Sequence, residues 1–141
     1  MEKYTFTRSR LRIELIESTL VESREAVESI MDTLRSAGVH FYLDDFGTGF
    51  SNLARVTRLQ VDVIKIDKSM LYEAESSMYC GTVLESLARA FCEHGREIIW
   101  EGVETQAQSD LVTSMGGHYM QGYLYAKPMP MEQAIALQKQ A

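Results

Sequence analysis

The chain has 141 residues, of which 45% are hydrophobic and 24% are charged, a composition typical of one globular domain. Its net charge of −6 argues against non-specific binding to DNA or RNA, because such binding depends on Lys and Arg side chains that neutralise phosphates. No apolar run approaches the about 18 residues that a transmembrane helix needs, and no signal peptide is recognisable, so the sequence predicts a cytoplasmic protein.

Apolar, strand-like runs alternate with helical segments along the chain. Residues 1–10 are polar and are interpreted as a leader or frayed segment, and a domain is predicted over 11–141. The strand-like runs are 11–17, 42–45, 61–67, 97–104 and 118–123. Between them apolar side chains recur at helical spacing, and Thr105 with Gln108 has the spacing of a capping box. This βαβα pattern predicts an α/β fold whose parallel sheet carries functional groups at the carboxyl ends of its strands.

The second run ends in two adjacent carboxylates, Asp44 and Asp45, before the turn Phe46-Gly47-Thr48-Gly49. Neighbouring carboxylates repel each other, and a divalent cation keeps both ionised. The alternative is an acidic turn in which one Asp caps the next helix. For a motif this short, such a turn is commoner than a metal site. The metal site is favoured by polar groups at or near the ends of the other four runs: Glu14, Lys65, Glu101 and Gln121.

The candidate metal ligands call for a hard divalent cation, whereas the candidate lysine calls for a negatively charged partner. Glu14, Asp44 and Asp45 offer carboxylate oxygens, which suit Mg²⁺ or Mn²⁺ better than a soft metal. Lys65 lies in an otherwise apolar strand, and a buried lysine needs a charged partner. A structural salt bridge to an acid on a neighbouring strand is therefore the alternative to a catalytic role for Lys65.

Five motifs along the chain resemble, in order and spacing, those of the EAL domain, a bacterial phosphodiesterase that opens the cyclic dinucleotide c-di-GMP. They are Glu14-Leu15-Ile16-Glu17-Ser18, Asp44 to Gly49, Lys65-Ile66-Asp67, Glu101 to Thr105, and Gln121 to Leu124 with Pro128. Each motif by itself is too short to indicate a family, whereas the five together are specific for this one. The resemblance covers the chain from about Leu11 onward and implies a TIM (β/α) barrel.

The resemblance also implies an activity and a role for each residue. The reaction would be metal-dependent hydrolysis of c-di-GMP to linear pGpG, with the three carboxylates named above as ligands of Mg²⁺ or Mn²⁺. Lys65 and Glu101 would lie beside the attacking water, and Gln121 would help to orient that group, so these three are the predicted catalytic residues. Glu17 would hold the loop 46–52 and not bind the metal, since its position in the strand differs in parity from that of the first ligand.

The sequence departs from the family pattern in two places and lacks part of it. Ile16 stands where the family has Thr, and Trp100 stands where it has a small residue, so that Trp100 either crowds the space behind Glu101 or packs outward against a helix. A complete barrel needs about 250 residues, and neither the Glu-Ala-Leu strand nor an Asn ligand occurs here. The chain is therefore predicted to form about five consecutive βα units of a partial TIM barrel, inactive or nearly so by itself.

Three functional hypotheses follow. The chain is a phosphodiesterase whose missing strands come from elsewhere, a non-catalytic module that binds c-di-GMP or a protein partner, or a different barrel metalloenzyme of the enolase type, which the order of the motifs disfavours. Helices on one side would leave the other face of the sheet, with Val61 and Val63, uncovered. A homo-oligomer or a complementing chain is therefore expected.

Overall fold

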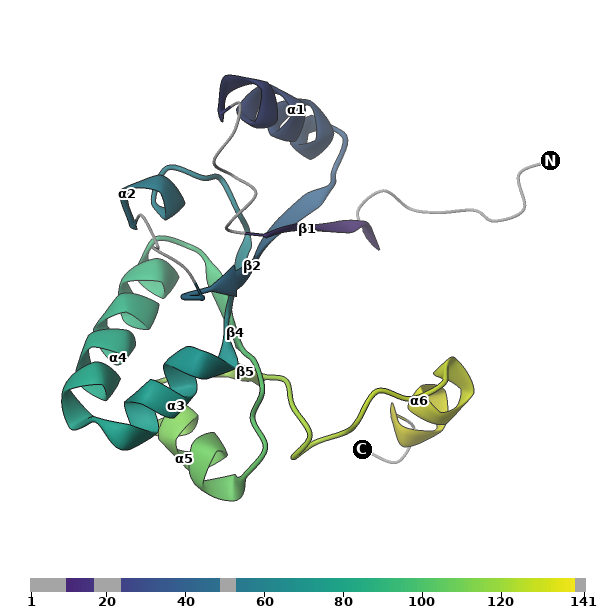
Figure 1. The fold of residues 1–141 in the computed structure, drawn as a ribbon. Coiled ribbons are helices and arrows are strands. Elements are labelled where there is room, and N and C mark those ends of the chain that lie inside the picture. The colour runs from purple at the N-terminus through teal and green to yellow at the C-terminus, as the bar shows by residue number, and fades with distance from the viewer. Residues whose placement is uncertain (1–9, 17–23, 49–52, 139–141) are drawn as a thin grey trace.

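Strands and helices alternate along the chain in the computed structural model, which describes residues 10–16, 24–48 and 53–138 (Figure 1). The strands are β1 (Arg12–Ile16), β2 (His40–Phe46), β3 (Val63–Ile66), β4 (Glu97–Trp100) and β5 (Tyr119–Met120). The helices are α1 (Arg24–Ser36), α2 (Leu53–Val56), α3 (Lys68–Ser76), α4 (Met78–Glu93), α5 (Gln106–Ser114) and α6 (Met131–Gln138). Each predicted strand-like run overlaps one of these strands.

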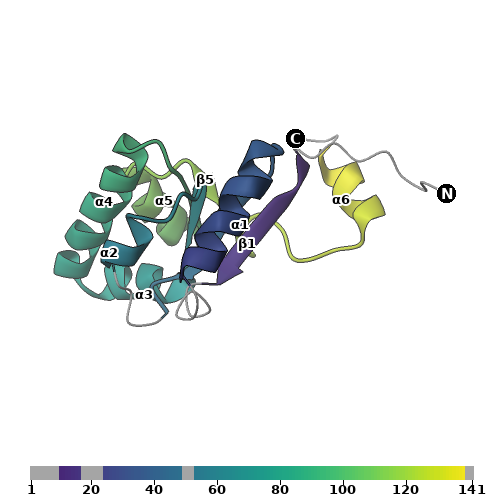
Figure 2. The ribbon, with the colours of Figure 1, turned by 90° about the horizontal axis from the view of Figure 1, so that it is seen from above.

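The strands of the described residues form one sheet in chain order, β1-β2-β3-β4-β5, and every neighbouring pair is parallel. Helices α3, α4 and α5 lie together on one side of the sheet, as Figures 1 and 2 both show. A strand order that follows the chain, with a helix in the connections, is what consecutive right-handed βα units produce. The predicted α/β fold with a parallel sheet is confirmed.

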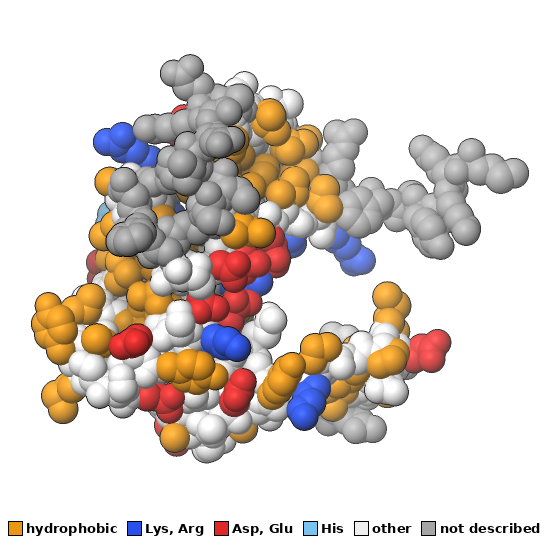
Figure 3. Space-filling view, viewed as in Figure 1, with side chains coloured by type: hydrophobic (Ala, Val, Ile, Leu, Met, Phe, Trp, Pro, Cys, Tyr) orange, Lys and Arg blue, Asp and Glu red, His pale blue; other side chains and the backbone are white. Residues whose placement is uncertain are grey.

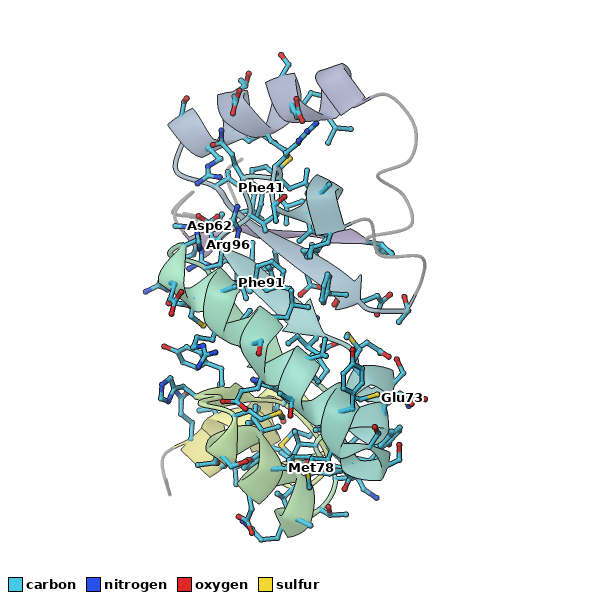
Figure 4. All side chains as sticks on the ribbon, turned by 90° about the vertical axis from the view of Figure 1, so that its left-hand side faces the viewer. Phe41, Asp62, Glu73, Met78, Phe91 and Arg96 are labelled. Carbon is cyan, nitrogen blue, oxygen red and sulfur yellow. The ribbon has the colours of Figure 1, made fainter. Side chains whose placement is uncertain are left out.

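The core lies between the sheet and these helices. Phe41 and Leu43 of β2 and Ile64 of β3 point to this side and are at most 2% exposed. Phe46 of β2 meets Phe91 of α4 edge to face, with the ring centroids 5.6 Å apart, which adds a specific contact to the burial of both rings. Figure 4 shows Phe41 beneath α1 and Phe91 on α4.

The opposite face of the sheet differs from the expectation of an uncovered surface. Val63 is only 3% exposed, although the helices α3, α4 and α5 lie on the other side, and Val61, which precedes β3 and belongs to the hydrophobic core cluster, is 4% exposed. Val63 is flanked on the neighbouring strands by Tyr42 and Glu97, and a twisted sheet crowds the side chains at its centre. The prediction that these two valines are uncovered is therefore wrong. Exposure is found instead toward the edge strands.

Helix α6 lies apart from the sheet and the other helices in both ribbon views (Figures 1 and 2). Its apolar side chains Met131, Ile135 and Leu137 are 78%, 47% and 45% exposed. Within the described ranges, no helix is long and apolar enough to cross a membrane.

The turn that follows β4 is fixed by the predicted capping box. The Thr105 hydroxyl accepts a hydrogen bond from the Gln108 N–H, and the Gln108 side chain accepts one from the Thr105 N–H. This reciprocal pair satisfies backbone donors that the first turn of α5 leaves without helical partners. At the other end, Gly116 has a φ of 80°, a left-handed conformation that glycine adopts without a Cβ clash.

Candidate metal centre

The carboxyl ends of the strands bring four of the predicted site residues together. The Nζ atom of Lys65 lies 2.8 Å from Asp44 Oδ1, 2.9 Å from Glu101 Oε1 and 3.4 Å from Glu14 Oε1. Lys65 belongs to β3, and the three acids come from β1, β2 and the residue directly after β4. Figure 3 shows acidic side chains gathered around basic atoms at a hollow between the main body and α6. The structural salt bridge considered for Lys65 is therefore present.

An extra residue in β2 directs both adjacent aspartates to this place. Leu43 pairs with Ile64 and Phe46 pairs with Ile66, so β2 contains one residue more than β3 over this stretch. Asp45 has a φ of 56°, the left-handed region that Asp enters more readily than most residues. In a regular strand, consecutive side chains point to opposite faces, whereas a bulge redirects one of them.

As a result, Asp44, Asp45 and Glu101 each place a carboxylate oxygen within 4.8 Å of the oxygens of the other two. All three residues are partly buried. Sequence reasoning predicted the two aspartates as ligands but did not foresee the bulge. The available signal was an Asp pair at the end of a strand directly before Phe-Gly, because Asp tolerates the left-handed conformation that a bulge requires.

The charged side chains of this cluster shift one another's pKa values. Burial by itself would lower the pKa of Lys65, but its contacts with Asp44 and Glu101 outweigh burial and raise the pKa above its ordinary value. Burial raises the pKa of Glu101, Lys65 opposes this, and the negative charges of Asp44 and Asp45 add to the increase. Lys65 therefore stays protonated at neutral pH and serves as the positive charge for the acids.

The donor set is chemically suited to a hard divalent ion. Three carboxylates that converge in a partly buried place repel one another, and a cation in addition to Lys65 relieves that repulsion. Carboxylate oxygens without sulfur or imidazole favour Mg²⁺, Mn²⁺ or Ca²⁺ over softer metals. Glu14 differs from the other predicted ligands, since its side chain is 49% exposed and contacts Lys65.

The loop that carries Glu101 is held by Gln108, a residue that sequence analysis considered only as a helix cap. The Oε1 atom of Gln108 accepts hydrogen bonds from the N–H groups of Glu104 (2.8 Å) and Thr105 (3.2 Å). Its Nε2 atom donates to Glu75 of α3 at 2.9 Å, and its side chain is buried. Gln108 thereby joins α3 and α5 to the segment directly after Glu101.

Two other predicted residues are placed differently. Gln121 follows β5 and is exposed, and its backbone N–H donates to the Trp100 carbonyl at 2.8 Å. Across the described parts of the chain, no hydrogen bond joins its side-chain amide to Lys65 or Glu101. Glu17 lies outside the described residues, as do residues 49–52 of the loop that it was expected to hold.

Trp100 packs outward, which decides between the two positions considered for it. Its side chain is completely buried on the helix side of the sheet. A Cβ atom added to Gly117 would lie 2.6 Å from Trp100 Nε1 and 2.4 Å from Val112 Cγ1, so the indole lies beside the end of α5. The space behind Glu101 is therefore not filled by this ring, and Ile16, the other departure, is 44% exposed.

Comparison with known proteins identifies the group to which this arrangement belongs. The family model of the EAL domain matches residues 1–128. The chain belongs to the EAL domain family. Among curated relatives of this EAL chain, the cyclic di-GMP phosphodiesterase PdeL of Escherichia coli K12 is 36% identical over 127 residues, which are 90% of this chain and 35% of PdeL.

Solved EAL structures share the fold. The c-di-GMP complex of the PaMucR phosphodiesterase has a TM-score of 0.81 and 33% sequence identity, over 92% of this chain and 52% of that one. The manganese and cyclic di-GMP complex of Klebsiella pneumoniae BlrP1 at pH 9.0 has a TM-score of 0.81 and 29% identity, over 87% of this chain and 31% of BlrP1. The chain thus has the fold of part of an EAL TIM barrel, and it spans about half or less of the relatives that it matches.

Proposed function

We propose that this EAL chain supplies the carboxyl-terminal strands of a metal-dependent phosphodiesterase site that hydrolyses c-di-GMP to linear pGpG. The observation that carries the proposal is the convergence of Asp44, Asp45 and Glu101 around Lys65 at the carboxyl ends of β2, β3 and β4. The names of its relatives support the substrate, since PdeL is a cyclic di-GMP phosphodiesterase and PaMucR was solved with c-di-GMP. We also propose a cytoplasmic location, as the composition predicts.

Mg²⁺ or Mn²⁺ would be held by Asp44 and Asp45, with Glu14 as the third predicted ligand. When bound, such ions lower the pKa of a coordinated water and neutralise charge on phosphoryl oxygens. BlrP1 was solved with manganese and with calcium, which supports a divalent ion of this class. A site formed by these residues alone would hold at most one ion weakly, because fewer protein oxygens surround it than in a complete site.

The chain's own residues have separate tasks in this proposal. Lys65 keeps its proton, so its Nζ atom neutralises Asp44 and Glu101 and donates to an oxygen placed between them. Glu101, whose pKa is raised by burial, is the group suited to accept a proton at its Oε atoms, because a useful base has a pKa near the working pH. Gln121 would turn its amide toward this group when the remaining strands are present.

The isolated chain is expected to convert little or no c-di-GMP, because the strands that would complete its metal shell are not among these residues. In the presence of Mn²⁺, chromatography should find only intact c-di-GMP after incubation with residues 1–141. A chimera that places the first strands of the PdeL EAL domain before Leu11 should produce linear pGpG. Asp44→Asn in that chimera should abolish the product.

Two outcomes would decide against this account. Rapid turnover by residues 1–141 alone, lost in Asp44→Asn, would show that the additional strands are not needed. A folded chimera that binds c-di-GMP without cleaving it would support the alternative of a non-catalytic module.

An oligomer or a complementing chain is proposed as well. The edges of the sheet leave Ile16 of β1 and Tyr119 of β5 44% and 53% exposed, and the apolar side of α6 is open. Strand edges and apolar side chains of this kind are normally paired or covered. We expect sedimentation to find residues 1–141 as a homodimer or larger assembly, with an interface of roughly 2,000 Å² or more. A compact monomer at micromolar concentration would contradict this prediction.

A further inference from the structure

The loop that follows Glu101 lies against α3, the helix that begins just after the strand of Lys65. A Cβ atom at Gly102 would lie 2.4 Å from the Cβ of Lys68, so the loop backbone packs directly on the first turn of α3. The N–H of Glu101 donates to the Ile66 carbonyl at 3.0 Å. The end of β3 and the start of α3 therefore form a common base on which Lys65 and Glu101 are both placed.

The far end of this loop is held by the side chain of Gln108 in α5, the neighbour of α3 (Figure 1). Its Oε1 atom accepts from the N–H groups of Glu104 at 2.8 Å and Thr105 at 3.2 Å, and its Nε2 atom donates to Glu75 at 2.9 Å. Gln108 is 4% exposed. Only this orientation of the amide satisfies all three partners, because the N–H groups need an acceptor and the carboxylate needs a donor.

Helix capping by itself does not explain a Gln at position 108. The third helical residue of a capping box has to supply only an acceptor, so Glu serves there as well as Gln does. Glu would also gain from the partial positive charge at the start of a helix. What Gln adds is the Nε2 donor, and here that donor makes a hydrogen bond with the charged Glu75. The residue type therefore fits a link between α3 and α5 as well as a cap.

We propose that Gln108 is a positioning residue for the metal centre, because its hydrogen bond to Glu75 fixes the loop that follows Glu101 against α3. The inference rests on the proposed function, since it concerns the same acids. The carboxylate oxygens of Asp44, Asp45 and Glu101 converge within 4.8 Å of one another. Metal affinity depends on such an arrangement being held in place, and groups that orient ligands without touching the ion commonly alter it.

Gln108→Glu separates the link to α3 from the helix cap. The new carboxylate still accepts from the N–H groups of Glu104 and Thr105, but it cannot donate to Glu75 and repels it. We expect Gln108→Glu to weaken Mn²⁺ binding by about fivefold, measured from the electron paramagnetic resonance signal of free Mn²⁺. Adding Glu75→Gln lets residue 75 donate in the opposite direction, and this second substitution should restore the affinity.

The matched control lies on the exposed side of the same helix. Gln106 Nε2 donates to Asp110 Oδ1 at 2.8 Å, a contact of the same chemistry within α5. Gln106→Glu breaks this hydrogen bond and adds the same negative charge to α5 that Gln108→Glu adds. It should leave the affinity for Mn²⁺ unchanged. A loss confined to Gln108→Glu therefore measures the position of the loop and not the added charge.

A second variant tests the link from its other end, in case Gln108→Glu does not fold. Glu75→Ala removes the acceptor from an exposed position of α3 and leaves the capping box intact. It should also weaken Mn²⁺ binding by about fivefold. Glu73→Ala, at another exposed position of α3, removes the same charge and should have no effect.

The outcomes separate this inference from the proposed function. Unchanged Mn²⁺ affinity in folded Gln108→Glu or Glu75→Ala, even with lower stability in urea, would show that Gln108 only stabilises the fold. Failure of Glu75→Gln to restore binding in the Gln108→Glu chain would equally overturn the inference. Both results would leave the metal site in place, whereas an unsubstituted chain that binds no Mn²⁺ would remove the site and this inference with it.

Discussion

Replacing Lys65 with Met is expected to destabilise the metal-free chain by about 3 kcal/mol, measured by urea unfolding. The Lys65 side chain is 10% exposed, and its partners Asp44 and Glu101 are 20% and 16% exposed, so little water is available to replace the ammonium. Removing one partner of such a cluster leaves uncompensated carboxylates close together. Met keeps most of the apolar part of the lysine side chain, so the loss of stability measures the contribution of the positive charge.

The matched control is Lys127→Met, because Lys127 is exposed and its ammonium lies 5.5 Å from the centre of the Tyr123 ring. An exposed cation of this kind contributes about 0.5–1 kcal/mol. Mn²⁺ should restore stability to the Lys65 variant and have little effect on the control, because only the former has acids that lack a cation. Equal loss in both variants, or no rescue by Mn²⁺, would show that Lys65 does not serve as the cation of the cluster.

Gly122→Ala is expected to destabilise the chain by about 3 kcal/mol, by forcing apart two segments of backbone. A Cβ atom at Gly122 would lie 2.0 Å from the Val103 carbonyl oxygen and 2.4 Å from the Val103 nitrogen. The same segments are joined by hydrogen bonds from the Val103 N–H to Gln121 (3.1 Å) and from the Leu124 N–H to Val103 (3.0 Å). Because neither side is a flexible side chain, the clash cannot be relieved locally.

Gly81→Ala is the control for this substitution. Gly81 lies in α4, and a Cβ there would meet its nearest heavy atom, the Ala74 carbonyl oxygen, at 3.6 Å, which is an ordinary contact. Ala is favoured over Gly in a helix by about 1 kcal/mol, so this variant should be as stable as the parent chain or more stable. A Gly122→Ala chain that unfolds at the same urea concentration as the Gly81→Ala chain would contradict the close packing of residues 121–124 against Val103.

The sequence predicted the features of the site that depend on strand ends. Glu14, Asp44, Lys65 and Glu101 each lie at or near the end of a strand-like run, and parallel strands place such ends along one edge of the sheet. The meeting of these residues was therefore foreseeable. Gln121 also lies at a strand end, but among the described residues no hydrogen bond joins its side chain to Lys65 or Glu101, so its part in the site stays a prediction.

Features that depend on tertiary packing were not foreseeable in the same way. The bulge at Asp45 arises from the pairing of β2 with β3, and periodicity does not reveal pairing register. The burial of Val63 depends on how the neighbouring strands twist around it, and the contact of Gln108 with Glu75 joins two helices distant in sequence. The capping-box spacing correctly predicted the cap and gave no sign of the second contact.

Titration of Mn²⁺ into residues 1–141 by calorimetry tests most directly whether the converging carboxylates form a metal site. The account predicts weak binding of one ion, reduced at least about tenfold by Asp45→Asn, which removes an anionic ligand and keeps a residue tolerant of the left-handed backbone. Asp32→Asn, an exposed position on α1, should leave the binding unchanged. Mn²⁺ binding that is the same in the Asp45→Asn chain as in the unsubstituted chain would contradict the assignment of this cluster as the metal centre.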